Sequence, residues 1–327
     1  MKTNTILVTG GAGYIGSHAV LALLDKKFKV VVLDNLIYGH KETIENLPNC
    51  KFIQGDIRDT DLVKKILVSN DVGLVMHFAA YAYVGESVKN PSKYYYNNVV
   101  GTLSLLQAML ETNVMNIVFS SSCATYGIPK SIPIKEEDCQ DPINAYGASK
   151  LMIERVLADY DKAYGLKSVI FRYFNAAGAD PNCRSGEDHN PETHIIPLVL
   201  DVALGKKDAF SVFGDDYETP DGTCIRDFVH VSDIASAHIK GLNYLIMNQK
   251  SNTFNLSNSS GTSVLEIINM ISKVTKKNIN INIKPKRKGD PAYLVGDATK
   301  ALDLLKWKAE FDLESMIKHA WIWHNRQ

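Results

Sequence analysis

The first 175 residues contain six short apolar runs, and stretches of helical periodicity lie between them. The runs are continuous rather than alternating, which is typical of parallel strands that are covered on both faces. They span 5–9, 29–34, 51–56, 73–78, 116–121 and 168–174. Strands and helices in alternation predict an α/β fold with a doubly wound parallel sheet.

Two of the helical stretches place apolar residues on one face. In 92–112 this stripe consists of Val99, Leu103, Leu106 and Leu110. In 145–164 it consists of Ile153, Leu157, Tyr160 and Tyr164. Such stripes are expected either in the core or in a contact between two subunits.

The pattern changes after about residue 175. Residues 175–194 are rich in Gly, Pro, Asn and Asp and predict a long loop, and shorter mixed segments follow. We expect a first domain over 1–175, joined by part of 226–256, and a smaller mixed α/β domain over 176–327. Ligands of doubly wound folds bind at the carboxyl ends of the strands, so a site between the two domains is expected.

Composition narrows the class of protein. The 36 basic residues balance the 36 acidic ones, so nothing in the charge suggests nucleic acid as a partner. The five cysteines show no C-x-x-C spacing, and no histidines show the spacing H-E-x-x-H, so we expect no disulfide framework and no metal. The weakly polar stretch 74–84 falls short of the ~18 residues that a membrane span needs. These features predict a cytoplasmic protein without membrane contact.

A glycine-rich segment, TGGAGYIG at 9–16, follows the first predicted strand. Gly10 permits a tight turn, Gly13 lets the backbone approach a pyrophosphate, and Gly16 permits close helix packing, which is the Rossmann dinucleotide pattern. Asp34 ends the second strand and suits a ribose diol, which favours NAD over NADP. Asp56, after the third strand, is a candidate for the adenine amino group or simply a solvated turn residue.

A second constellation combines Ser122, Tyr146 and Lys150. Tyr146 and Lys150 are four residues apart at the start of a helical pattern, so they share a face. A free tyrosine has a pKa near ~10, and a nearby ammonium together with a cationic nicotinamide would lower it. Ser122 follows the fifth strand. Together the three predict proton removal from an alcohol beside NAD.

With these motifs the chain resembles the extended short-chain dehydrogenases/reductases, and among them the UDP-glucose 4-epimerase family. The blocks that carry the resemblance are TGGAGYIGSH, LDNL, HFAA, VGES, YYYNNVVGT, FSSS, YGASK, RYFNAAGA, DGTCIRDFVHV and GDPA. They span nearly the whole chain. The resemblance implies NAD bound by the first domain and a UDP-sugar bound by the second, with reversible inversion at C4 of a UDP-hexose through a transient 4-keto sugar.

The residues after Ser122 bear on the reaction. Related 4,6-dehydratases carry Asp and Glu there, and related decarboxylases carry Glu, whereas this chain has Cys123 and Ala124. Neither residue is a general acid for elimination. A dehydratase, and also a non-catalytic NAD-binding protein, are therefore less favoured alternatives.

The resemblance also implies the residues that contact each ligand. For NAD they are Gly10, Gly13, Tyr14, Ile15, Gly16, Asp34, Asn35, Asp56, Ile57, Phe78, Ala79, Ala80, Asn97, Ser120, Tyr146, Lys150 and Tyr173. For the UDP-sugar they are Ser122, Tyr146, Phe174, Asn175, His194, Ile195, Ser211, Phe213, Arg226, Phe228, Arg287, Asp290 and Leu294. Three of these have a structural alternative: Arg226 in a buried ion pair, Phe213 in the core, and His194 in loop packing.

Some positions depart from the family pattern. Ala82 stands where many members have a lysine near the cofactor. Leu294 stands near the position where members restricted to plain hexoses have a tyrosine. A UDP-N-acetylglucosamine 4-epimerase, or a bifunctional enzyme that acts on both kinds of sugar, therefore remains an alternative. The family further implies a homodimer formed through the helices at 92–112 and 145–164.

Overall fold

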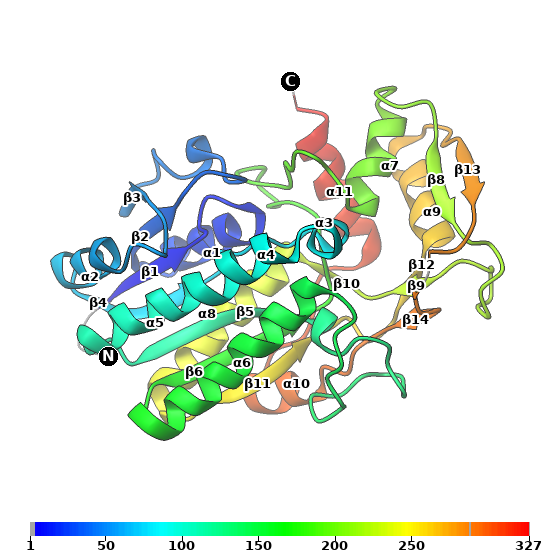
Figure 1. Cartoon of the computed structure of the whole chain (residues 1–327). Coiled ribbons are helices and arrows are strands. Elements are labelled where there is room, and N and C mark those ends of the chain that lie inside the picture. Colours follow the sequence, from blue (N-terminus) through cyan, green and yellow to red (C-terminus); the bar gives the residue numbers. More distant parts are fainter. Residues whose placement is uncertain (1–3, 288, 327) are drawn as a thin grey trace.

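The structure, a computed structural model, describes residues 4–287 and 289–326. A parallel sheet of seven strands forms its centre, in the order β3, β2, β1, β4, β5, β6 and β11 (Figure 1). The strands are β1 Thr5–Thr9, β2 Lys29–Asp34, β3 Cys50–Gln54, β4 Val72–His77, β5 Asn116–Ser122, β6 Lys167–Tyr173 and β11 Asn252–Leu256. The predicted Rossmann-type α/β fold is confirmed, and six strands fall within two residues of the predicted runs.

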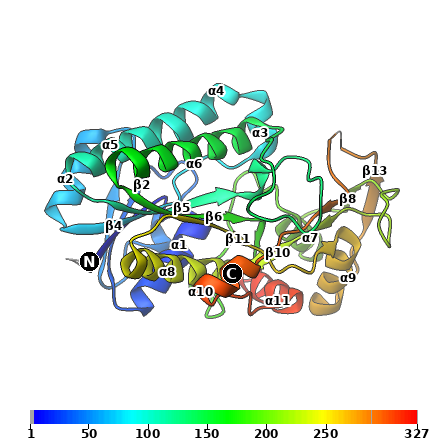
Figure 2. The same cartoon turned by 90° about the horizontal axis from the view of Figure 1, so that it is seen from below.

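Helices cover both faces of this sheet (Figure 2). One layer contains α1 Tyr14–Asp25, α8 Val231–Asn248 and α10 Thr299–Leu305, and the other contains α2 Thr60–Ser69, α5 Gly101–Glu111 and α6 Ala145–Tyr164. Successive strand residues point into opposite layers: Ile6 and Val8 belong to the core beneath α1 and α8, and Leu7 to the core beneath α2, α5 and α6. This double burial explains why the strands read as continuous apolar runs.

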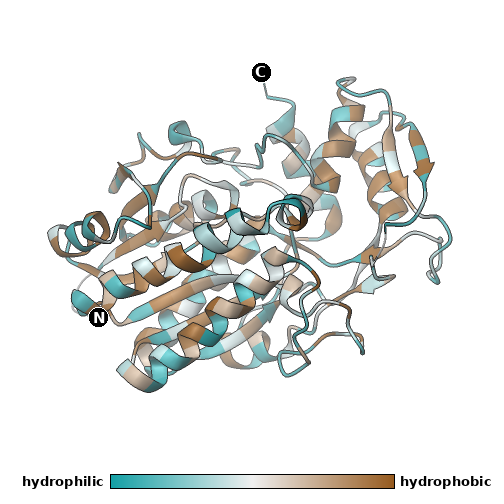
Figure 3. Ribbon diagram, in the orientation of Figure 1, coloured by the Kyte–Doolittle hydropathy of each residue, from teal (hydrophilic) through white to brown (hydrophobic). Residues whose placement is uncertain are grey.

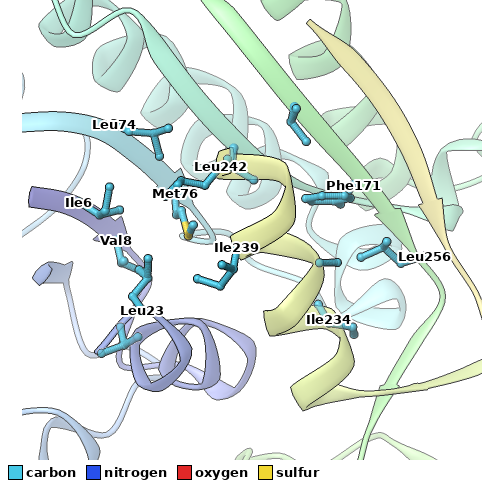
Figure 4. Close-up of a cluster of buried hydrophobic side chains, with 14 of the residues drawn as sticks. Ile6, Val8, Leu23, Leu74, Met76, Phe171, Ile234, Ile239, Leu242 and Leu256 are labelled. Atoms are coloured by element: carbon cyan, nitrogen blue, oxygen red, sulfur yellow. The ribbon is translucent and has the colours of Figure 1, made fainter. Parts of the chain in front are cut away.

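The core on the α8 side is the larger of the two. Figure 4 shows Ile234, Ile239 and Leu242 of α8 facing side chains of the sheet. In Figure 3 the central strands are largely hydrophobic, whereas the helices around them carry both hydrophilic and hydrophobic residues. The sheet is therefore the apolar centre of this half of the molecule, and the helices separate it from solvent.

A second region lies beyond the carboxyl end of the sheet, on the right in Figure 1. Its helices are α7 Ile195–Ala203, α9 Val264–Thr275 and α11 Leu313–His324. Its strands are β8 Phe210–Phe213, β9 Ile225–Arg226, β12 Thr262–Ser263, β13 Ile281–Lys284 and β14 Tyr293–Leu294. These elements share a separate core that includes Ile196, Val212, Ile271 and Ile317.

The remaining elements are short. They are η1 Lys41–Thr43, α3 Val84–Lys89, α4 Pro91–Tyr94, η2 Tyr95–Val100, η3 Cys123–Thr125, β7 Asn175–Ala177 and β10 Phe228–His230. β7 pairs with β10 in parallel at the junction of the two regions.

None of the helices in the described part of the chain has both the length and the low polarity that a bilayer crossing requires.

The chain passes between the two regions more than once. After β10 it returns as α8 and β11, and β11 pairs with β6 in the central sheet. Further on, α10 and Trp307 also pack into the core beneath α8, where Trp307 Nε1 donates to Asp233 O at 3.0 Å. The division into domains at residue 175 stays a prediction.

The stripe predicted for 92–112 is partly wrong. Leu106 is fully buried as expected, but Leu103 is 38% exposed, and Leu105 and Met109 are buried instead. Within α5 the buried face runs along Leu105, Leu106 and Met109, and Leu103 lies off that face. The helix carries more leucines than one face can hold, so their positions alone did not fix which of them are buried.

Candidate active site

Ser122, Tyr146 and Lys150 come together where β5 ends. Ser122 is the last residue of this strand, and the other two lie in the first two turns of α6. Lys150 is 2% exposed, and its Nζ donates to the carbonyl oxygen of Ser120 at 2.7 Å. The same Nζ lies 5.9 Å from the centre of the Tyr146 ring. The three side chains therefore face one small region at the carboxyl edge of the sheet.

Burial dominates the ionisation of the two titratable members. It raises the pKa of Tyr146 to about 12, although hydrogen bonding with Ser122 acts in the opposite direction. Burial also lowers the pKa of Lys150 to about 7, against the attraction of Glu154. The expected lowering of the Tyr146 pKa by Lys150 is thus absent from the protein alone, because removal from water penalises each charge separately.

The two residues after Ser122 have uncharged side chains. Cys123 and Ala124 start η3, and the Ala124 amide donates to Ser122 Oγ at 3.1 Å. Burial raises the pKa of the Cys123 thiol to about 12, with Asp227 acting in the same direction. The side chains at these two positions therefore carry no proton that is acidic enough for general acid catalysis near neutral pH.

The glycine segment forms a tight loop between β1 and α1. Gly10 has φ +71° and donates to the carbonyl oxygen of Leu33 at 2.9 Å. A Cβ at Gly16 would lie 2.1 Å from the Gly10 carbonyl oxygen, so this position admits only glycine. Gly13 is the N-cap of α1 and has no side chain to cap it. The first amides of α1 are therefore available to an anion such as a pyrophosphate, and the loop fits a dinucleotide.

Asp34 lies beside this loop and is 8% exposed. Its Oδ2 accepts from the Ala12 amide at 3.0 Å and its Oδ1 from the Leu36 amide at 2.8 Å. Burial raises its pKa, and the two amides oppose that effect. Each carboxylate oxygen retains a lone pair for a ribose hydroxyl.

Asp56 has a protein partner of its own. Arg58 binds it through two nitrogens at 2.8 and 2.6 Å and lowers its pKa to about 2. Asn35 donates to the same carboxylate at 3.2 Å. This turn is therefore an ordered, charged cluster rather than a free solvated residue.

The other predicted cofactor residues lie at or near the same edge of the sheet. Phe78, Ala79 and Ala80 follow β4, and a Cβ at Gly10 would lie 2.5 Å from the Ala79 amide, so the two loops touch. Tyr173 ends β6, and its hydroxyl is bonded to Ser120 Oγ. The others are Tyr14 and Ile15 in α1, Ile57 in the core beneath α2, and Asn97 in η2.

A cavity of about 410 Å³ opens between α7, β8 and β9. Nine predicted substrate residues line it: Asn175, His194, Ile195, Ser211, Phe213, Arg226, Phe228, Arg287 and Asp290. The guanidinium carbon of Arg287 stands 4.1 Å from the centre of the Phe213 ring. A cavity with two arginines and an exposed aromatic edge suits an anionic ligand that carries a planar base.

Arg226 forms an ion pair inside this cavity. Its partner is Asp290, and not Asp227, the acidic residue next to it in the sequence. Asp227 instead accepts from Ser257 and from the amide of Asn258. Arg226 and Asp290, which were both predicted to contact the UDP-sugar, therefore form an ion pair with each other.

Comparison with known proteins identifies the family. A family model described as GDP-mannose 4,6 dehydratase matches residues 7–320. The UDP-glucose 4-epimerase of Halalkalibacterium halodurans is 52% identical over 98% of this chain and 95% of its own length. The chain belongs to the UDP-glucose 4-epimerase family.

Solved structures of the UDP-glucose 4-epimerase family agree with this result. The enzyme of Bifidobacterium longum, crystallised with NAD⁺ and UDP, is 40% identical with a TM-score of 0.93, and 98% of each chain is covered. The UDP-Glc/GlcNAc 4-epimerase of Campylobacter jejuni is 43% identical with a TM-score of 0.87, again with 98% of each chain covered. The family likeness thus includes proteins whose names mention N-acetylated sugars.

Four predicted substrate residues of this family member lie outside the cavity lining. Ser122 and Tyr146 stand at the end of β5 and the start of α6, as described above. Phe174 belongs to a small core with Cys123, and the partly buried Leu294 packs against this core. Leu294 also stands beside Arg226 in the pairing of β14 with β9, which puts it between the cavity and Cys123.

His194 has partners that its predicted phosphate contact did not anticipate. Its Nδ1 lies 2.7 Å from Glu187 Oε1 and 2.8 Å from Glu192 Oε1. Burial alone would lower the pKa of His194, but these carboxylates raise it to about 10. The alternative of a histidine engaged within its loop is thus the one that these contacts favour.

Sequence reasoning missed a buried ion pair that supports the site. Arg172 Nη2 lies 2.6 Å from Glu154 Oε2, and both side chains are less than 10% exposed. Ser121 also donates to Glu154, so β5, β6 and α6 meet at this carboxylate. The signal was an arginine inside the apolar run SVIFRYF, because a buried charge requires a partner.

Proposed function

We propose that this chain catalyses reversible epimerisation at C4 of a UDP-hexose, interconverting UDP-glucose and UDP-galactose, with NAD retained in the site. The observation that carries the proposal is the meeting of Ser122, Tyr146 and Lys150 beside two neutral residues, Cys123 and Ala124. The glycine loop suits the dinucleotide, and the cavity of Arg226 and Arg287 suits a diphosphate.

The proposed roles follow from where the side chains stand. Bound NAD would supply the acceptor, and later the donor, of the hydride at C4 of the sugar, and its oxidised form would add a positive charge to the site. Tyr146 Oη takes the proton of the C4 hydroxyl, and Ser122 Oγ shares that proton. Lys150 Nζ donates to Ser120 O, and its positive charge together with that of bound NAD would favour the phenolate form of Tyr146. Tyr146 returns the proton when the opposite epimer forms.

The uncharged residues Cys123 and Ala124 explain why the reaction ends with epimerisation. Elimination of water from the 4-keto sugar needs a nearby acid and base, and Cys123 and Ala124 supply neither. The family-model name GDP-mannose 4,6 dehydratase is therefore not carried over to the activity of this chain.

The test is conversion of UDP-galactose by the purified protein, with products separated by chromatography. We expect UDP-glucose as the product and a fall in kcat of about 10²–10⁴-fold in Tyr146→Phe. Tyr164→Phe, on an exposed part of the same helix, is the matched control and should keep wild-type turnover. Full activity of Tyr146→Phe, or a product that has lost water, would refute the proposal.

A second candidate substrate is the N-acetylated pair, UDP-N-acetylglucosamine and UDP-N-acetylgalactosamine. The observation in its favour is Leu294, which is smaller than the tyrosine expected in enzymes restricted to plain hexoses. Comparing kcat/KM for UDP-galactose and UDP-N-acetylgalactosamine decides between the plain and the N-acetylated pair, since these two substrates differ from each other only at C2.

We further propose a division of labour between residues 1–175, which bind NAD together with part of 226–256, and residues 176–327, which bind the UDP-sugar. The support is the position of the glycine loop in the first range and of the cavity in the second. Arg287→Ala should then weaken UDP binding and leave NAD retention unchanged, as measured by calorimetry and by nucleotide release. Loss of NAD in this variant would contradict the division.

A homodimer formed through α5 and α6 is also proposed. Exposed apolar residues on these helices or beside them support it, because Val100, Leu103 and Met152 are 42%, 38% and 44% exposed. Light scattering with Leu103→Glu tests it: a wild-type dimer and a variant monomer are expected.

We assign the protein to the cytoplasm, since all five cysteines are free, as a reducing compartment favours.

A further inference from the structure

Four side chains of types that bind metals converge just before α7. Glu187, His189, Glu192 and His194 come from one loop, and each offers one oxygen or nitrogen as a ligand atom. These four ligand atoms all lie within 4.8 Å of one another. Their spacing is E-x-H-x-x-E-x-H, which differs from the H-E-x-x-H pattern on which the expectation of no metal rested.

The distances among these atoms match those of a small coordination sphere. His194 Nδ1 lies 2.7 Å from Glu187 Oε1, and His189 Nδ1 lies 3.3 Å from that same oxygen. His189 Nδ1 is also 3.9 Å from Glu192 Oε2. Ligands placed about 2.0–2.1 Å from a tetrahedral zinc ion are about 3.3–3.4 Å apart. These three separations depart from that value by about 0.7 Å or less. No two of the four ligand atoms are more than 4.8 Å apart, so small side-chain movements are needed to complete the sphere.

The donor set selects the class of ion. Two imidazole nitrogens and two carboxylate oxygens suit zinc and its neighbours among the transition metals, whereas magnesium and calcium prefer oxygen alone. The two carboxylates also balance the charge of a divalent cation. Glu187 is only 4% exposed and needs a counter-charge, and a bound cation would take over the role that protonated His194 has in the metal-free protein.

The loop is also held in place and accessible from one side. The indole nitrogen of Trp323 donates to the Glu187 carbonyl oxygen at 3.0 Å, and the His189 ring packs edge-on against Tyr14 with centroids 6.1 Å apart. The His194 side chain is 43% exposed and lines the large cavity, which gives an ion a way in.

We propose that Glu187, His189, Glu192 and His194 form a binding site for one divalent transition-metal ion, with zinc as the ion that the donor set favours. The ion would clamp the loop that forms one wall of the substrate cavity. This site goes beyond the epimerase function and does not rest on it, since the proposed reaction uses none of these four residues to move a proton.

The competing explanation is a cluster of histidine–glutamate ion pairs that needs no metal. Both explanations predict the same contacts in the metal-free protein. They differ in metal content, and they differ in what a change at His189 does, because its Nδ1 is a ligand in one case and a modest ion-pair partner at 3.3 Å in the other.

The test uses the purified full-length chain after chelator treatment and dialysis against zinc with excess magnesium. Metal content is measured by plasma emission, and we expect one zinc per chain. Cobalt in place of zinc should give the visible absorption of a four- or five-coordinate site without the near-ultraviolet band of a thiolate ligand. The same experiments are run on His189→Asn, Glu192→Gln and His40→Asn, each checked for folding by circular dichroism.

His189→Asn and Glu192→Gln should each lower zinc affinity at least about tenfold, since even the loss of an outer-sphere partner costs that much. His40→Asn should bind zinc as the wild type does, because His40 pairs only with Asp188 in the described part of the chain and is a nearby histidine outside the cluster. Metal content at background, displacement by magnesium, a thiolate band, or equal affinity in the folded His189→Asn and Glu192→Gln proteins would each overturn the site.

Discussion

Lys150 offers a quantitative test of the electrostatics of the site. Its ammonium is almost completely removed from water, and burial lowers its pKa from 10.5 to about 7. The unfolded chain therefore binds more protons than the folded one between these two values. Stability contributed by this group must rise with pH across that window.

The size of the effect follows from the two pKa values. Each factor of ten in a protonation equilibrium is worth about 1.4 kcal/mol. Burying the Lys150 amine, including the proton that it gives up on folding, then costs about 4 kcal/mol at pH 7 and about 2 kcal/mol at pH 9. Lys150→Met removes this cost. The free energy of unfolding of the variant, relative to that of the wild type, should therefore fall by about 2 kcal/mol from pH 7 to pH 9.

Comparing the two pH values isolates this effect from packing. Methionine also leaves the Ser120 carbonyl oxygen without its donor, but that loss is the same at both pH values. The assay is urea unfolding of wild type and Lys150→Met, both freed of dinucleotide, with Lys89→Met as the exposed control. A stability difference that stays constant, or grows, as the pH rises would refute the reasoning. Turnover by Lys150→Met should fall about 10²–10⁴-fold in parallel.

Three further predictions address the support of the site and its selectivity. Glu154→Gln leaves the charge of Arg172 buried without its partner and should cost about 3–5 kcal/mol in urea unfolding; a loss below 1 kcal/mol would argue against the ion pair. Gly16→Ala forces a Cβ against loop backbone and should yield protein without NAD on release assay, whereas Gly85→Ala, with open space around it, should retain NAD. Leu294→Tyr should lower kcat/KM for UDP-N-acetylgalactosamine relative to UDP-galactose at least about tenfold; an unchanged ratio would remove Leu294 as the selector.

The sequence predicted the sheet well because its strands are buried on both faces. A run such as 29–34 shows continuous apolar residues whichever face each side chain takes, so its position needs no knowledge of its neighbours. β11 was missed because NTFNL mixes polar and apolar residues, and Asn255 is buried through a bond to Tyr126, a partner 129 residues away. That kind of strand is stabilised by contacts that only the fold supplies.

The site was predictable to the extent that its residues are local. The glycine loop and the pair Tyr146–Lys150 depend on spacing along one helix or turn, and the structure places them as that spacing implies. The ionisation of Tyr146 was not predictable, because burial raises its pKa and burial is a property of the whole fold. The ion pair between Arg226 and Asp290 likewise joins β9 to a loop far along the chain.

The late return of α8, β11 and α10 to the sheet has a consequence for synthesis. A nascent chain that ends near residue 175 would hold β6 as an open edge, with Phe171 and Val169 on a face that α8 has yet to cover. Unpaired edges and bare apolar faces invite association with other chains. We therefore expect the amino-terminal half to stay incompletely folded, and open to chaperone binding, until the segment that contains Trp307 has been synthesised.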